Sequence, residues 1–187
     1  MLSQRKQVER VLSITLILNL LVAVGKITVG LMSGALAITA DGVHSLTDSA
    51  GNVVGLVAIR IADRPPDDDH PYGHRKFETL SALLIGGLLL LTAWEMVQGI
   101  FGRLSGGEEP TLTPLTFAVL IGTLLINIVV SRYQIRKGQE FKSQILLADA
   151  KNTHADVYVT LSVIVSMGLV ALGWGWMDLL VALIVAG

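Results

Sequence analysis

Residues 35–62 read ALAITADGVHSLTDSAGNVVGLVAIRIA, an apolar run longer than the roughly 20 residues that a helix needs to cross a bilayer. Its first half carries ionisable side chains, which are costly inside a membrane and therefore mark candidate functional positions. Four polar side chains share one face of a helix, because they are three, four and four residues apart. They are Asp41, His44, Asp48 and Asn52. The stretch predicts a membrane-spanning helix with a polar stripe.

The composition of the whole chain agrees with this interpretation. Of its 187 residues, 52% are hydrophobic and 16% are charged, and the mean hydropathy is +0.64. Soluble domains carry about 25% charged residues, so a single soluble domain and a disordered chain are both excluded. The absence of Cys excludes a disulfide scaffold and leaves His, Asp, Glu or Asn to bind any metal. The net charge of −1 argues against nucleic acid as a partner.

Five further apolar runs accompany residues 35–62. They cover residues 12–32, 80–101, 112–131, 145–172 and 177–187. We therefore expect an all-α, polytopic membrane protein with six helices, embedded in the lipid bilayer. The last run has 11 residues and would rise only about 16 Å, roughly half a hydrocarbon core. We expect the chain to stop inside this sixth helix. The first run is long enough to span the membrane, so we do not expect a cleaved signal peptide.

Lys and Arg predict the orientation of the bundle. Twelve of the 14 basic residues precede the first run or lie around the second-to-third and fourth-to-fifth connections. The positive-inside rule places these three regions in the cytoplasm. We expect a multi-pass protein of the cell (inner) membrane with a cytoplasmic N-terminus.

A second segment repeats the polar pattern. Residues 40–48 follow the pattern A-D-x-x-H-x-x-x-D and residues 148–156 follow A-D-x-x-N-x-x-x-D, with matched positions 108 residues apart. Paired polar segments in separate helices indicate a shared site near the middle of the membrane. An imidazole, an amide oxygen and two carboxylates suit a four-coordinate divalent metal, whose charge the carboxylates neutralise. The candidate ligands are His44, Asp48, Asn152 and Asp156.

The alternative is that these side chains only hydrogen-bond helix to helix, although the duplicated spacing argues against it. His154 lies two residues from Asp156, on the opposite face of the helix, and is excluded from the metal site. Lys26 in the first run and Glu95 in the third could pair or face the bundle interior, and the sequence does not decide between these arrangements.

A second candidate metal site lies in the connection DDDHPYGH, residues 67–74. Asp67, His70 and His74 could close on one metal ion if the loop folds back. A solvated acidic loop is an equally good explanation of the same spacing.

Residues 40–48, 148–156 and the block D-H-P-Y-G-H-x-K-x-E-x-L at 69–80 together resemble the cation diffusion facilitator family. The resemblance covers nearly the whole chain and implies a six-helix transporter, usually a homodimer, that exports divalent metal ions in exchange for protons. It also implies a cytoplasmic C-terminal metal-binding domain of ferredoxin-like fold, so we expect residues 1–187 to be the transmembrane domain without it.

By position, the resemblance assigns His44, Asp48, Asn152 and Asp156 to the central transport site, and Asp67, His70 and His74 to a loop site seen in some members. Zinc-selective members commonly have His at the position of Asn152. An amide oxygen is a harder and weaker ligand for zinc than imidazole. Members with Asn at a central position include manganese exporters, so the resemblance favours Mn²⁺ or Fe²⁺ as the transported ion. Zn²⁺ remains an alternative because His44 is retained.

The expected mechanism is alternating access around the central site. Metal ligands must be deprotonated, so metal binding releases protons, and protonation on the outer side would eject the ion. His44 is the expected coupling group, helped by Asp48 or Asp156. The divalent metal is thus a substrate, and no cofactor is expected.

An intramembrane metallohydrolase and a metal-binding protein without transport are the two other functional classes. An intramembrane metallohydrolase would carry a motif such as His-Glu-x-x-His, which the chain lacks, so we expect no enzyme. A metal-binding sensor or assembly protein without transport remains an alternative.

Overall fold

The computed structural model describes residues 2–62, 67, 71–74, 76–104 and 110–186. Within these residues the chain is helical and contains no strand, which confirms the predicted all-α class. The six helices are α1 (Leu2–Ser33), α2 (Leu36–Ala62), α3 (Lys76–Leu104), α4 (Pro114–Glu140), α5 (Gln144–Ala171) and α6 (Trp176–Ala186).

Three helical segments are long and apolar enough to cross a membrane, as judged on the described residues. They are Lys6–Ser33, Pro114–Glu140 and Gln144–Ala171. Helices α2 and α3 have 27 and 29 residues, and at about 1.5 Å per residue each is roughly 40 Å long. Helix α6 is shorter, with 11 residues.

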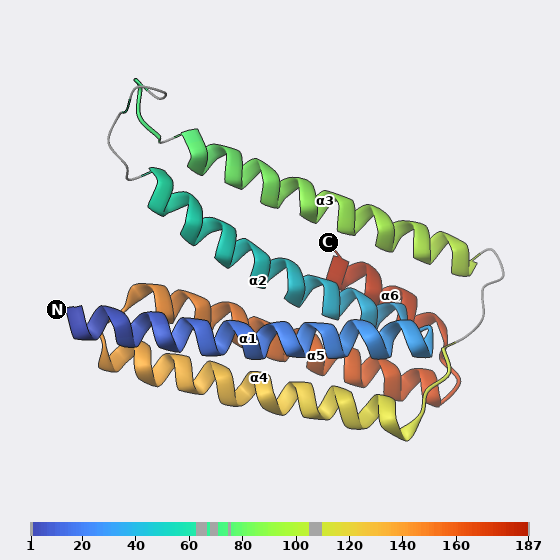
Figure 1. The fold of residues 1–187 in the computed structure, drawn as a ribbon. Coiled ribbons are helices and arrows are strands. Elements are labelled where there is room, and N and C mark those ends of the chain that lie inside the picture. Colours follow the sequence, from blue (N-terminus) through green and yellow to red (C-terminus); the bar gives the residue numbers. More distant parts are fainter. Residues whose placement is uncertain (1, 63–66, 68–70, 75, 105–109, 187) are drawn as a thin grey trace.

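The helices run up and down, so that their ends gather at two ends of the bundle (Figure 1). The start of α1, the end of α2, the start of α3 and the α4–α5 connection lie at one end, and the short α1–α2 and α5–α6 links lie at the other. The first end is called the basic end, and the opposite one the far end. Described basic residues at the basic end include Lys6, Arg10, Lys76, Arg136 and Lys142.

Helix α2 is central to the arrangement. It packs against α1, α3, α5 and α6, whereas α3 contacts only α2 and α6 among the described helices. In Figure 1, α3 accordingly lies at the edge of the bundle, with α2 between it and α1. A buried apolar cluster at the far end joins α2, α4, α5 and α6; its largest members are Ile38, Leu120, Val163 and Met167.

Helices α1 and α2 approach closely because glycine occupies their contact. A Cβ atom added at Gly42 would lie 2.7 Å from the backbone nitrogen of Ile27 and 2.9 Å from the Cβ of Lys26. Gly30 meets Thr39 in the same way. Small residues permit such backbone approach between membrane helices. The approach brings Lys26 of α1 beside α2.

The first turn of α2 is held by a carboxylate of α6. Asp178, which is fully buried, accepts hydrogen bonds from the backbone N–H groups of Leu36 (3.0 Å) and Ala37 (2.9 Å). These are two of the N–H groups that a helix start leaves without an intrahelical partner, and a carboxylate also interacts favourably with the helix dipole there. The contact fixes the far end of the helix that carries the polar stripe.

Candidate metal centre

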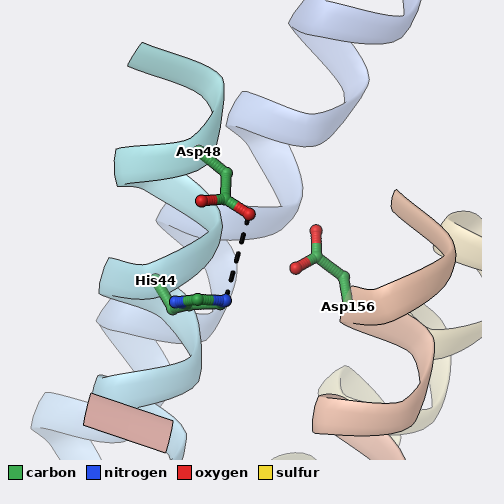
Figure 2. A group of neighbouring side chains, drawn as sticks. All are labelled: His44, Asp48 and Asp156. Carbon is green, nitrogen blue, oxygen red and sulfur yellow. Dashed lines mark ion pairs between the residues drawn. The ribbon is translucent and has the colours of Figure 1, made fainter. Parts of the chain in front are cut away.

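Three of the four predicted central ligands converge between α2 and α5. His44 and Asp48 lie on successive turns of α2, and Asp156 points toward them from α5 (Figure 2). One ligand atom from each residue lies within 4.8 Å of the other two. His44, Asp48 and Asp156 are called the metal cluster below.

The metal cluster is loosely arranged. His44 Nε2 is 3.9 Å from Asp48 Oδ2, which is too far for a hydrogen bond, and about a third of each of these side chains is exposed. Asp156 is buried, and its Oδ1 has no hydrogen-bond partner among the described residues. Tetrahedral ligands at about 2.0–2.2 Å from a metal lie roughly 3.4 Å apart, so small side-chain movements would complete a site. Its charge, two carboxylates and one imidazole, matches a divalent cation.

Asn152 lies one helical turn from Asp156, toward the basic end. Its exposed side chain lines a cavity of about 620 Å³ between α1, α2 and α5. Other polar residues of this lining are Asn19, Ser49, Asn52 and Asp149. The cavity therefore lies on the basic-end side of the metal cluster, whose three residues are not part of its lining. Asn152 as fourth metal ligand stays a prediction.

Asn52 lies on the polar stripe of α2, and Asp149 belongs to the repeated motif of α5. The two side chains form a hydrogen-bond network separate from the metal cluster. Asn52 Nδ2 donates to Asp149 Oδ1 (2.7 Å), and Gln134 Nε2 of α4 donates to the other carboxylate oxygen. The network connects α2, α4 and α5 near the basic end. For these two residues the helix-to-helix interpretation is the right one. Gln134 was not predicted, since it stands alone outside any repeated spacing.

Asp41, on the polar stripe of α2, belongs to another cluster, together with Thr160 of α5. The Lys26 ammonium of α1 donates to Asp41 Oδ1 (2.9 Å), to Thr160 Oγ1 (2.8 Å) and to Ser45 Oγ (3.3 Å). The Thr160 hydroxyl in turn donates to Asp41 Oδ2 (3.0 Å). All four side chains are buried. Lys26, Asp41, Ser45 and Thr160 are called the Lys26 cluster. Lys26 therefore faces the bundle interior and pairs with Asp41. The Glu95 side chain lies outside the described part of the chain.

The comparison with known families decides the classification. The model of the cation efflux transmembrane domain matches residues 12–187. The chain belongs to the cation diffusion facilitator family. Membership in this family agrees with the repeated motif at residues 40–48 of α2 and 148–156 of α5.

Curated relatives cover nearly the whole chain. The manganese efflux system protein MneP of Bacillus subtilis is 34% identical over 97% of this chain and 62% of its own length. An uncharacterized transporter of Methanocaldococcus jannaschii is 32% identical over 97% of this chain and 64% of its own length. Metal tolerance protein C1 of Arabidopsis thaliana is 32% identical over 95% of this chain and 41% of its own length. The chain thus spans less than two thirds of these relatives.

In this family member, two of the three predicted loop ligands are adjacent. His74 Nε2 lies 3.3 Å from Asp67 Oδ2, and the His74 ring, nearly buried, stacks on Phe77 with ring centroids 5.8 Å apart. His70 lies outside the described residues. The loop site therefore stays a prediction.

His154 does not join the metal cluster, as its spacing predicted. Its ring is exposed and makes an edge-to-face contact with Tyr158, with centroids 5.2 Å apart.

Proposed function

We propose that this chain is the transmembrane part of a transporter that moves divalent metal ions out of the cytoplasm, with His44, Asp48 and Asp156 as ligands. The observation that carries the proposal is the convergence of three metal-ligating side chains from α2 and α5. Among the described residues, no Lys or Arg forms an ion pair with Asp48 or Asp156. Ionisable groups at membrane depth mark ion pathways. The metal ion is the substrate and is not a resident cofactor.

Among divalent ions, Mn²⁺ is the proposed cargo ahead of Fe²⁺ and Zn²⁺. Two carboxylates and the amide oxygen of Asn152 would give a harder ligand set than the histidines of a typical zinc site. A relative that is named a manganese efflux system protein supports this choice. His44 keeps zinc as a competitor.

The proposed direction of transport follows from charge and from the cavity. Basic residues gather at one end of the bundle, and the positive-inside rule assigns that end to the cytoplasmic side of the inner membrane. The 620 Å³ cavity runs from that end toward the metal cluster, whereas the far end is filled by the buried apolar cluster. An ion entering from the cytoplasm would follow the cavity to His44 and Asp48, and rocking of the helices would then expose it to the other side.

Proton coupling is the proposed energy source. Metal ligands have to lose their protons before they bind, so each metal ion displaces protons and rebinding of protons favours metal release. Imidazole is the ligand type that changes charge near neutral pH, which makes His44 the proposed coupling residue. The driving reaction is exchange of the metal ion for protons.

The working unit is proposed to be a homodimer, as in the family. Helix α3 lies at the edge of the bundle and exposes Leu83, Leu90, Leu91 and Trp94, so it offers an apolar surface to a second copy or to lipid. Cysteine cross-linking along α3 in membranes separates the two: a periodic pattern of cross-links supports the dimer.

Flux measurements test the proposed function. The purified chain is placed in proteoliposomes containing a metal-sensitive dye, and Mn²⁺, Fe²⁺ and Zn²⁺ are supplied separately with and without a pH gradient. Gradient-dependent Mn²⁺ flux is the expected result. Metal binding with no flux in any condition would contradict transport by this chain and favour the alternative of a metal-binding sensor or assembly protein.

A further inference from the structure

Directly beside the metal cluster, the bundle contains a second set of cation-binding oxygens. Asp41 precedes His44 by three residues on α2, and Thr160 follows Asp156 by four residues on α5. Both steps lead one helical turn, about 5 Å, toward the far end. With Ser45 they provide a carboxylate and two hydroxyl oxygens, all buried. Hard divalent cations prefer such oxygen ligands.

This second set already holds a positive charge. The Lys26 ammonium lies 2.8–3.3 Å from an oxygen of Asp41, Ser45 and Thr160. An ammonium group has three N–H donors and no acceptor, so three oxygen acceptors satisfy it completely. Oxygen ligands of Ca²⁺ lie at about 2.3–2.6 Å, which these side chains would reach by moving roughly 0.2–1.0 Å, with the largest movement at Ser45.

We propose that the Lys26 ammonium is a tethered cation that fills a second, oxygen-lined cation site made by Asp41, Ser45 and Thr160, and that it thereby keeps a divalent metal ion out of that site. The inference rests on the proposed transport role of the metal cluster. An ion leaving His44 toward the far end passes the Lys26 cluster. Were the site empty, the buried Asp41 carboxylate would hold that ion one turn beyond the place from which it must be released.

The position of Lys26 requires a long side chain that ends in a positive charge. Its stem leaves α1 where Gly42 lets the two backbones approach, and only the terminal nitrogen reaches the oxygens of α2 and α5. Methionine is one atom shorter than lysine and carries no charge, so Lys26→Met keeps the apolar stem and vacates the position of the ammonium. Arginine at the same place keeps the cation.

The test is the number of Mn²⁺ ions bound by the 187-residue chain in lipid nanodiscs, measured by equilibrium dialysis. Lys26→Met is expected to bind one Mn²⁺ more than the wild type. The double variant with Asp41→Asn should lose the extra ion, and Lys26→Arg should bind as many as the wild type. Any binding at the Asp67–His74 loop contributes equally to every variant, so the difference is the readout. Folded Lys26→Met that binds no additional Mn²⁺ overturns the proposal.

A variant that does not fold without metal is handled in a second measurement. Lys26→Met is combined with Asp156→Asn, purified in the presence of Mn²⁺, and its thermal unfolding is followed against Mn²⁺ concentration beside Asp156→Asn alone. The second site is supported if Mn²⁺ stabilises the double variant but does not stabilise Asp156→Asn alone. Equal responses of the two proteins, or a double variant that does not fold even with Mn²⁺, overturn the proposal. Failure of the proposed function gives a different result. In that case the wild type and Asp156→Asn would bind the same number of Mn²⁺ ions.

Discussion

The metal cluster and the oxygen acceptors of the Lys26 cluster lie on the same two helices, one turn apart, and Lys26 reaches those acceptors from α1. In the Lys26 cluster every member is buried and joined by hydrogen bonds of 2.8–3.3 Å. In the metal cluster His44 and Asp48 stand 3.9 Å apart and partly exposed, and Asp156 Oδ1 has no partner in the described part of the chain. The difference is the cation, which the chain itself supplies in one case and has to acquire from solution in the other.

The comparison implies opposite costs for removing a carboxylate. A buried ion pair that loses one partner leaves an uncompensated charge and costs stability. A carboxylate that forms no direct ion pair with Lys or Arg leaves no buried ammonium unpaired when it is removed, so its removal should cost function and spare the fold. The two clusters should therefore separate cleanly into one that maintains the bundle and one that moves the ion.

The largest expected effect is on transport. Asp156→Asn should lower Mn²⁺ flux by about 100-fold or more, because it removes one of the two charges that compensate a dication in a low-dielectric site, and Asp48→Ala should do the same. Glu140→Gln is the control, since its exposed carboxylate pairs with Lys137 on α4 and does not line the cavity. Flux is measured in proteoliposomes. Wild-type flux in Asp156→Asn, or an equal loss in Glu140→Gln, would contradict the assignment.

The next effect is on stability. Asp41→Ala should destabilise the bundle by about 3–5 kcal/mol, because the Lys26 ammonium is left buried without its carboxylate. Asp48→Ala should not. Thermal unfolding in detergent micelles, read by size-exclusion fluorescence, compares the two. Equal stability of both variants would remove the distinction between the clusters.

Disturbing the close packing of α1 against α2 should lower stability by a smaller amount. A Cβ at Gly42 meets the backbone of Ile27, so Gly42→Ala should cost about 1–3 kcal/mol by forcing the helices apart and should loosen the Lys26 cluster. Gly25→Ala serves as control, because a Cβ there meets nothing within 4 Å. The same unfolding assay applies. A Gly42→Ala protein as stable as Gly25→Ala would show that close packing is not what brings Lys26 to Asp41.

Ion preference sharpens the comparison further. Asn152→His should shift the preference from Mn²⁺ toward Zn²⁺ by about tenfold, because imidazole is the softer ligand. Competition between the two ions in the flux assay measures the shift. An unchanged ratio would exclude Asn152 from the site and leave it as a lining residue of the cavity.

Binding should also depend on pH. Protons compete with the metal for its ligands, so Mn²⁺ affinity should fall by about tenfold or more between pH 7.5 and 5.5. Isothermal titration at several pH values checks this, and His44→Gln should flatten the profile. A flat profile in the wild type would contradict metal–proton exchange.

Sequence periodicity predicted the helical bundle and three members of the metal cluster. Positions 44, 48 and 156 follow from spacing, because a helix places residues three and four apart on one face. Spacing could not separate Asp41 from His44 on that face, since the separation depends on which residue of α1 lies opposite. Only the close approach at Gly42 brings Lys26 to Asp41.

Two other hydrogen-bonded contacts between helices could not be predicted from the local sequence pattern. Asp178 caps the start of α2 from 142 residues away in the sequence, and Gln134 reaches Asp149 from a neighbouring helix. Both are single polar residues in apolar or mixed surroundings, where a sequence pattern does not reveal the partner. Such contacts come from tertiary packing.

The most direct test of the metal cluster is electron spin-echo spectroscopy of Mn²⁺ bound to the wild-type chain, to His44→Gln and to His74→Gln. The metal cluster has a single imidazole, so one histidine nitrogen should couple to Mn²⁺ in the wild type and in His74→Gln, and the coupling should vanish in His44→Gln. Coupling that persists in His44→Gln, or disappears in His74→Gln, would move the metal to another part of the molecule and contradict the account.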